Sequence, residues 1–309
     1  FIGSGNYANR ILIPSFMNSG AILDTLISND GLKPSIYGKR YKFKYISTST
    51  KDFLARSGCN NVVITTRHNS HAELVKDCLL KGKNVFVEKP LCISLKELDE
   101  IFNIYKSLIK SRSNAPILTV GFNRRFAPLI IKLKQLLSKL SGQSAFNYSI
   151  NSGYIPSNNW VHDPKIGGGR LIGEACHFLD LLLFLSESSI EKISVLSMKD
   201  FKLKPDTFVM QVKFKNGSIG TINYFSNGSK NFPKERLEVF KENSIFILNN
   251  FRSLKAYGCK YFKRKTTFVQ NKGNANLAKA FMNSINTFEN PIPINDLFDV
   301  HRKLLELSQ

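Results

Sequence analysis

Two adjacent opposite charges end an apolar run in VFVEKPL (85–91), where Pro90 follows Glu88 and Lys89. We call residues 88–90 the EKP turn. A continuous apolar run is typical of a parallel strand buried on both faces. Parallel α/β sheets bind ligands beyond the carboxyl ends of their strands, so this strand would deliver both charges to a ligand site. There Lys89 could give or take a proton once partial burial lowers its pKa, and Glu88 could orient it. A surface ion pair is the simpler interpretation.

The segment GSGNYA (3–8) matches the G-x-G-x-x-G/A pattern of dinucleotide-binding turns. In that pattern the first glycine makes a tight turn, the second lets the backbone approach a pyrophosphate, and the small third residue lets the helix pack on the strand. Free N–H groups at the helix start would face the phosphates. A plain strand–turn–helix is the alternative. The residues expected to bind a dinucleotide here are Gly3, Gly5, Asn6, Tyr7 and Ala8.

Two more predicted strand ends carry polar side chains that could reach the same nucleotide. TTRHNSH follows a strand at 61–66, and NRRF follows a strand at 117–122. Parallel strands end at one edge of a sheet, so both runs should lie near the EKP turn. Arg125 could also contact the substrate, whereas Arg124 could be a surface charge. The cofactor contacts expected at the strand ends are Thr65, Thr66, Arg67, His71, Glu88, Lys89 and Arg125.

The choice between NAD and NADP depends on the end of the second predicted strand, where an acidic residue would bind the ribose 2′-OH of NAD. This chain has Ser28 and Asn29 there, then Asp30, and Lys33 three residues later. Ser28, Asn29 and Lys33 could accept a 2′-phosphate, so we favour NADP. Asp30 keeps NAD open.

Strands alternate with helices over the first 122 residues, which predicts a doubly wound parallel sheet. Consecutive strands with hairpin signals follow, which predicts an α+β domain with an antiparallel sheet. We expect domains at 1–122 and 123–309, with the last helices packing back on the first domain. The predicted strands are 1–3, 21–28, 61–66, 84–88, 117–122, 144–151, 191–198, 207–215, 218–225, 235–240 and 244–249. The predicted helices are 6–18, 51–56, 70–81, one capped by Ser94 and Glu97, 127–140, 170–186, 275–288 and 295–307.

The composition fits an ordinary globular protein, with 309 residues of which 42% are hydrophobic. No apolar run approaches the roughly 18–20 residues of a membrane span, so we expect no membrane partner. The net charge is +21, but the lysines are scattered and cluster only at 39–44 and 260–265, so we expect a solvated surface and no nucleic acid. Five cysteines without a C-x-x-C pair favour reduced thiols in a cytoplasmic protein.

The chain resembles the glucose-fructose oxidoreductase/inositol dehydrogenase/MocA (Gfo/Idh/MocA) family over nearly its whole length. The resemblance implies a Rossmann domain and a second domain with a large, mostly antiparallel open sheet. It implies NAD(P)-dependent hydride transfer at a hydroxyl or keto carbon of a sugar, nucleotide sugar or cyclitol, and a homo-oligomer. It makes Lys89 catalytic and maps the family's helix histidine to His177. The motifs that carry it, in family order, are GSGNYA (3–8), GKNVFVEKPL (82–91), GFNRRFAP (121–128) and GGGRLIGEACHFLD (167–180).

One position departs from the family pattern. Many members carry Asp four residues before the helix histidine, but this chain has Gly173 there, followed by Glu174. Glu174 and His177 are spaced i, i+3, so Glu174 could orient His177 and join the catalytic residues. These two side chains alone are too few ligands for zinc, and we expect no metal. Without that compensation, a dinucleotide-binding sensor or assembly module that has lost turnover is the alternative.

The resemblance also implies a sugar pocket and a longer protein. A substrate site would combine Lys89, Arg125, Glu174 and His177 with loop residues before the glycines. Within the family, the sequence most resembles the carboxyl-terminal module of bacterial bi-domain oxidoreductases, in which a zinc-type alcohol dehydrogenase module comes first. That would explain a start at Phe1, and it links the chain to surface-polysaccharide biosynthesis. The loop candidates are Tyr154, Trp160 and His162.

Overall fold

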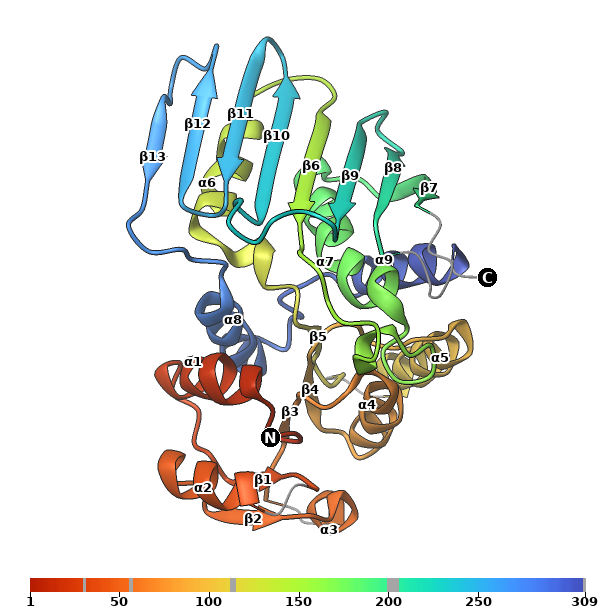
Figure 1. Cartoon of the computed structure of the whole chain (residues 1–309). Coiled ribbons are helices and arrows are strands. Elements are labelled where there is room, and N and C mark those ends of the chain that lie inside the picture. The colour runs from red at the N-terminus through yellow and green to blue at the C-terminus, as the bar shows by residue number, and fades with distance from the viewer. Residues whose placement is uncertain (30–31, 56–57, 112–114, 199–205, 308–309) are drawn as a thin grey trace. The chain divides into compact units, whose positions relative to one another are not determined.

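The structure is a computed structural model that describes residues 1–29, 32–55, 58–111, 115–198 and 206–307 (Figure 1). Its contacts divide the chain into two units. The first contains Phe1–Gly121 and Asn274–His301, and the second contains Phe122–Gly273 and the chain from Arg302. The last two helices therefore group mainly with the first unit, although they lie at the end of the sequence.

The first unit is built on a parallel sheet. Ile2 forms single parallel bridges to Ile27 and Ile64, so the first residues of the chain join two groups of strands. The order β2–β1–Ile2–β3–β4–β5 is the doubly wound order of a dinucleotide-binding domain, which confirms the predicted fold class. Its strands are β1 (Thr25–Ile27), β2 (Tyr45–Ser47), β3 (Asn61–Ile64), β4 (Asn84–Val87) and β5 (Leu118–Val120).

Helices connect these strands. The predicted cap of α5 is confirmed, because the Glu97 carboxylate accepts from the Ser94 N–H at 3.1 Å and the Ser94 hydroxyl accepts from the Glu97 N–H at 3.3 Å. The helical segments are η1 (Ala8–Leu12), α1 (Ile13–Asn18), α2 (Leu32–Tyr41), α3 (Thr50–Ala55), η2 (His68–Ser70), α4 (His71–Leu80), α5 (Leu95–Ser111), α8 (Asn274–Thr287) and α9 (Ile294–Glu306).

One prediction for the first unit was too long, and two elements were missed. The strand expected at 21–28 is limited to β1, and the sequence analysis missed α2 and β2. For β2 the reason is exposure. β2 is a sheet-edge strand whose three residues are exposed or half-buried, so it lacks the apolar pattern of a buried strand. The basic run at 39–44, taken as a charge cluster, ends α2 and leads into β2.

The second unit is an eight-stranded sheet of order β13–β12–β11–β10–β6–β9–β8–β7, and it confirms the mostly antiparallel sheet. One inner pair, β6 with β9, is parallel. Strands β12 and β13 were missed, because β12 has a single buried residue and β13 is an edge strand with all three residues exposed. The strands are β6 (Ala145–Asn151), β7 (Ile190–Ser197), β8 (Phe208–Phe214), β9 (Ile219–Phe225), β10 (Glu235–Lys241), β11 (Ser244–Asn249), β12 (Ser253–Tyr257) and β13 (Arg264–Thr266).

Helices α6 and α7 lie against one face of this sheet (Figure 1). Along β10 the buried side chains alternate with exposed or half-buried ones, as expected for a sheet covered on one face. None of the helices in the described ranges combines the length and apolar character that crossing a membrane requires. The helical segments of this unit are η3 (Asn123–Phe126), α6 (Pro128–Leu137), η4 (Trp160–His162) and α7 (Gly169–Ser186).

Candidate functional site

The glycine turn and the loop after β3 lie in direct contact. Gly3 has φ +104°, and a Cβ there would lie 2.7 Å from the carbonyl oxygen of Thr65, so only glycine fits. The Thr65 hydroxyl donates to the carbonyl oxygen of Gly3 at 3.0 Å. A Cβ on Gly5, in contrast, would meet no atom within 4 Å. The turn is therefore packed closely at its first glycine and open at its second, as a pyrophosphate-binding turn requires.

The end of β1 lies beside the same turn. The Ser4 hydroxyl donates to the Ser28 hydroxyl at 2.8 Å, and Asn29 is exposed. Asp30 lies outside the described residues, and so does the side chain of Lys33. The other residues of the turn differ in exposure, because Asn6 and Tyr7 are exposed whereas Ala8 is buried against the fold. The Tyr7 hydroxyl donates to Asn274 Oδ1 at 2.9 Å.

The EKP turn leaves the sheet directly after β4. Glu88 and Lys89 are half-buried, and the Glu88 N–H still donates to the Ile64 carbonyl oxygen at 2.9 Å. A Cβ on Gly121 would lie 2.5 Å from Glu88 Oε1, so the glycine after β5 makes room for the Glu88 side chain. The peptide bond between Lys89 and Pro90 is cis. Within this unit, then, β3, β4 and β5 are neighbouring parallel strands, and their carboxyl ends lie together as predicted. Arg67, in the loop after β3, is exposed.

Two fully buried histidines flank the EKP turn. His71 Nδ1 lies 2.7 Å from the Pro90 carbonyl oxygen, and His71 Nε2 lies 3.1 Å from the Thr66 carbonyl oxygen. The Leu91 N–H donates to His301 Nε2 at 2.9 Å. Burial lowers the pKa of both imidazoles, that of His301 to about 4. His71 thus contacts the backbone on both sides of its ring, and a contact between His71 and a cofactor stays a prediction.

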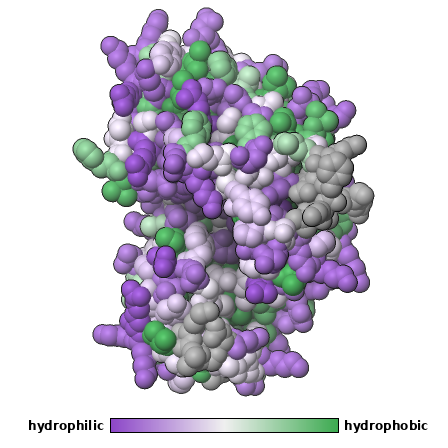
Figure 2. Space-filling view, in the orientation of Figure 1, coloured by the Kyte–Doolittle hydropathy of each residue, from purple (hydrophilic) through white to green (hydrophobic). Residues whose placement is uncertain are grey.

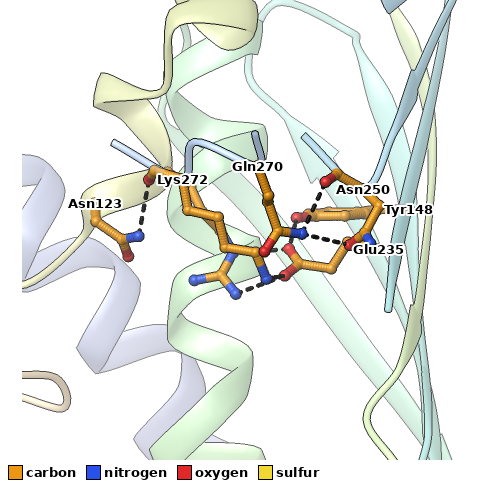
Figure 3. A network of polar contacts seen from close by, with 7 residues as sticks. Asn123, Tyr148, Glu235, Asn250, Gln270 and Lys272 are labelled. Carbon is orange, nitrogen blue, oxygen red and sulfur yellow. Dashed lines mark hydrogen bonds and ion pairs between the residues drawn. The ribbon is translucent and has the colours of Figure 1, made fainter. Parts of the chain in front are cut away.

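The polar side chains of the NRRF motif all point into the second unit. Asn123 Nδ2 donates to the Lys272 carbonyl oxygen at 2.8 Å (Figure 3). Arg124, expected as a surface charge, is 5% exposed, and that prediction was wrong. Arg125 is also buried, and its guanidinium donates to the Asp180 carboxylate at 2.8 Å. A ligand contact by Arg125 stays a prediction, and what the structure shows is an internal ion pair.

Arg124 forms an ion pair with Glu235, and Figure 3 shows Glu235 beside Tyr148 and Lys272. Glu235, at the start of β10, accepts hydrogen bonds from Arg124 at 2.8 and 2.9 Å, from Lys272 at 2.7 Å and from the Tyr148 hydroxyl. Burial alone would raise the pKa of Glu235, but Arg124 and Lys272 outweigh it and hold that pKa well below its usual range. Glu235 is therefore a buried carboxylate that stays charged.

The glycines before α7 have a structural reason. A Cβ on Gly167 would lie 2.3 Å from the Val161 carbonyl oxygen, and Gly168 and Gly169 have φ of +73° and +82°. The loop can therefore turn tightly against η4 and start the helix. In that loop, Tyr154 is exposed and Trp160 half-buried, whereas His162 is buried with its Nε2 3.4 Å from the Ile155 carbonyl oxygen. Their roles toward a sugar stay predictions.

On α7, Glu174 and His177 occupy the positions expected from the sequence. His177 is buried, and its ring centroid lies 6.1 Å from that of Phe122. Glu174 is half-buried, whereas every other residue from Ile172 to Leu183 is buried. Glu174 is therefore the one residue of this stretch of α7 that is partly accessible to solvent.

The structure adds polar residues around Glu174 that the sequence analysis missed. Burial lowers the pKa of Lys234, and the carboxylates of Glu174 and Glu235 act in the opposite direction. Burial raises the pKa of Tyr224, and the charge of Glu174 raises it further. The charge of Glu174 therefore acts on both Lys234 and Tyr224. Among the described residues, no three His, Cys, Asp or Glu side chains gather to hold a metal ion.

Comparisons with known proteins agree with this architecture. A family model described as "Oxidoreductase family, NAD-binding Rossmann fold" matches residues 1–111, and a "GFO/IDH/MocA C-terminal domain" model matches residues 140–246. Myo-inositol 2-dehydrogenase of Thermotoga maritima is 25% identical over 199 residues, which cover 62% of this chain and 57% of that protein. The chain thus spans just over half the length of this relative.

Two solved structures share the fold along the whole chain. A levoglucosan dehydrogenase in complex with NADH and levoglucosan superposes with a TM-score of 0.82 at 16% identity, covering 99% of this chain and 95% of that one. A UDP-N-acetylglucosamine 3-dehydrogenase from Acidithiobacillus ferrooxidans gives a TM-score of 0.79 at 16% identity, with the same coverage of both chains.

Proposed function

Because the chain belongs to the Gfo/Idh/MocA family of oxidoreductases, we propose that it transfers hydride between a nicotinamide cofactor and a hydroxyl or keto carbon of a sugar, nucleotide sugar or cyclitol. One observation carries this proposal. The glycine turn, closed at Gly3 and open at Gly5, touches the loop after β3, and Lys89 follows β4, the next strand of the same sheet, by two residues. A dinucleotide site and a proton-transfer group share one sheet edge.

Each residue has a proposed part in the reaction. A bound nicotinamide supplies or accepts the hydride. In oxidation Lys89 removes the substrate's hydroxyl proton, and in reduction it returns a proton to the developing alkoxide. Glu88, held against Gly121, orients Lys89. His177 is the second candidate for proton transfer, with Glu174 one helical turn before it.

Finer features belong to the same proposal. Nucleotide sugars are favoured as substrates by the likeness to a UDP-N-acetylglucosamine dehydrogenase, and cyclitols by the myo-inositol dehydrogenase relative. NADP is favoured over NAD by Ser28 and Asn29 at the end of β1. A role in surface-polysaccharide biosynthesis, a homo-oligomer and an upstream dehydrogenase module are further parts of the proposal, suggested by the sequence motifs.

A second candidate function rests on Gly173. It removes the Asp that many family members carry before the helix histidine, so the chain could bind a dinucleotide as a sensor without turnover. Saturable binding of NADPH or NADH with no turnover of any tested sugar would favour this candidate.

The test combines binding and turnover. Fluorescence titration with NADPH and with NADH measures the cofactor site, and a panel of myo-inositol, levoglucosan and UDP-N-acetylglucosamine measures hydride transfer. Lys89→Ala should keep cofactor binding and lower kcat by about 10²–10⁴-fold, the usual contribution of a positioned acid–base group. Lys96→Ala, an exposed lysine of α5, is the matched control. Unchanged kcat in Lys89→Ala would remove Lys89 from the mechanism.

A further inference from the structure

A single peptide group behind the EKP turn is held by two imidazoles. The carbonyl oxygen of Pro90 and the N–H of Leu91 belong to the same peptide bond. His71 Nδ1 lies 2.7 Å from that oxygen, and His301 Nε2 accepts from that N–H at 2.9 Å. His71 comes from the first residue of α4, and His301 comes from α9. Two helices thus grip both polar atoms of one peptide unit.

The hydrogen bonds fix the chemical state of His301. Because its Nε2 accepts a hydrogen bond, the proton of the neutral ring sits on Nδ1, which donates to the Leu297 carbonyl oxygen at 2.6 Å. His301 is 1% exposed, and burial favours the neutral ring. The ring therefore joins Leu91 to the previous turn of its own helix.

His71 reaches two segments at once. Both ring nitrogens face carbonyl oxygens, which only accept, so a neutral imidazole can donate to one of them and only the protonated ring could donate to both. We assign the proton of the neutral ring to Nδ1, because its distance of 2.7 Å to the Pro90 carbonyl oxygen is shorter than the 3.1 Å between Nε2 and the Thr66 carbonyl oxygen. The ring is fully buried between these two loops. One loop carries Lys89, and the other carries Thr65, which bonds to the glycine turn.

The location explains why polar rather than apolar side chains are needed. The ladder of β4 ends at Val87, so Pro90 and Leu91 have left the sheet, and both are buried. A buried peptide group without partners costs free energy comparable to a lost hydrogen bond. Leucine at position 71 or 301 could fill similar space, but it would leave one of these backbone groups without this partner.

We propose that His71 and His301 are positioning residues that fix the peptide group after Pro90 and so hold Lys89 in its working orientation. The catalytic part rests on the proposed function of Lys89. Neither histidine is expected to touch substrate. We call the contacts of His71 and His301 with this peptide group the histidine clamp. Hydrogen exchange and lysine labelling measure the clamp without any turnover, so failure of the clamp can be told apart from failure of the proposed reaction.

The first test measures the clamp itself. In His301→Leu the Leu91 amide should exchange about tenfold faster or more than in the wild type, the factor expected for one lost hydrogen bond. The rate at which reductive methylation labels Lys89 should change with it. His301→Gln, whose side-chain oxygen can accept from Leu91, should restore part of both. Val300→Ala trims another buried residue of α9 and should leave both rates unchanged. Equal Leu91 exchange or equal Lys89 labelling in His301→Leu and wild type would overturn the proposal.

The second test needs no variant that might fail to fold. Nitrogen NMR of the histidine rings at neutral pH distinguishes the two neutral tautomers. The proposal requires a proton on Nδ1 of His301, and a proton on Nε2 would overturn it. If a substrate is turned over, His301→Leu should lower kcat while leaving the Kd for NADH unchanged, because the glycine turn is untouched. Loss of NADH binding alone would contradict a role in positioning Lys89.

Discussion

The two units hold their candidate site residues by different physical means. In the first unit the anchors are neutral: glycines that make room, threonine and serine hydroxyls, and two buried imidazoles bonded to backbone. In the second unit the anchors are charges, with Arg124 on Glu235 and Arg125 on Asp180, all of them buried. The first unit uses hydrogen bonds to backbone groups that lie just beyond the ends of strands. The second unit uses ion pairs between buried side chains.

This difference decides what each unit is sensitive to. A neutral hydrogen bond contributes about 0.5–1.5 kcal/mol, and removing one partner costs the desolvation of the other. A buried charge that loses its partner costs more, because the remaining ion has no compensation. The second unit should therefore suffer most from single substitutions, and the first unit should respond earlier to mild acid.

The largest expected effect breaks the charged anchor. Arg124→Leu removes two hydrogen bonds from the buried Glu235 carboxylate and leaves Lys272 bonded to it, so we expect the free energy of unfolding to fall by about 3 kcal/mol, the lower end of the cost of breaking a buried ion pair. Urea denaturation of the variant and the wild type measures this. Arg236→Leu, which removes a half-exposed partner of Glu238, is the control and should cost less than about 1 kcal/mol. Similar losses in the two variants would show that burial of the pair does not matter.

The next effect sharpens the comparison through pH. The pKa of His301 is lowered to about 4 in the folded chain, so the unfolded chain binds the proton first as the pH falls. Stability from this group is complete above its ordinary pKa of about 6.5 and declines by roughly 3 kcal/mol as the pH falls toward 4. The pKa of Glu235 is lowered as well, but it is lowered from an ordinary value of about 4.5, so the contribution of Glu235 is complete over most of this window and declines mainly below pH 4.5.

Denaturation of wild type and His301→Gln between about pH 7 and pH 4.5 checks that expectation. The stability advantage of the wild type should shrink as the pH falls, because the variant has lost the titrating group. A constant difference across the window would mean that His301 does not change protonation on unfolding.

The smallest effect tests whether any ion pair of the second unit is strong. Lys213 and Glu191 form a pair at 2.7 Å, but their side chains are 54% and 43% exposed. Solvent screens such a pair, so Glu191→Gln should cost less than about 1 kcal/mol. Thermal denaturation at low and high salt measures it. If Glu191→Gln cost as much free energy of unfolding as Arg124→Leu, the strength of an ion pair would not depend on its burial.

The positions of the candidate site residues of the first unit could be predicted from the sequence. Gly3 and Gly5 lie in a turn, and Glu88 and Lys89 follow a strand, as expected, because a glycine pattern and a strand end can be recognised within a few residues. Their roles toward a ligand stay predictions. His301 could not be placed in this way. Its partner Leu91 lies 210 positions earlier, so no local pattern links the two residues.

The buried ion pairs of the second unit could not be predicted, because they join distant parts of the chain. Arg124 and Glu235 are 111 residues apart, and Arg125 and Asp180 are 55 apart. The sequence did contain a signal. Glu235 occupies the same face of β10 as Leu237 and Val239, and all three side chains are buried. An acid in register with core residues indicates a buried charge, but nothing local identifies its partner.

The bond between Leu91 and His301 has a consequence for how the protein is made. The ribosome releases the EKP turn long before residue 301 emerges, and domains fold from the amino terminus as they are synthesised. A nascent chain can form the parallel sheet and the glycine turn early, but the peptide after Pro90 lacks one of its two imidazole partners until α9 is synthesised. A nascent chain that ends before α9 would therefore carry Lys89 without its final alignment, and the emergence of α9 from the ribosome would be the step that completes this part of the site.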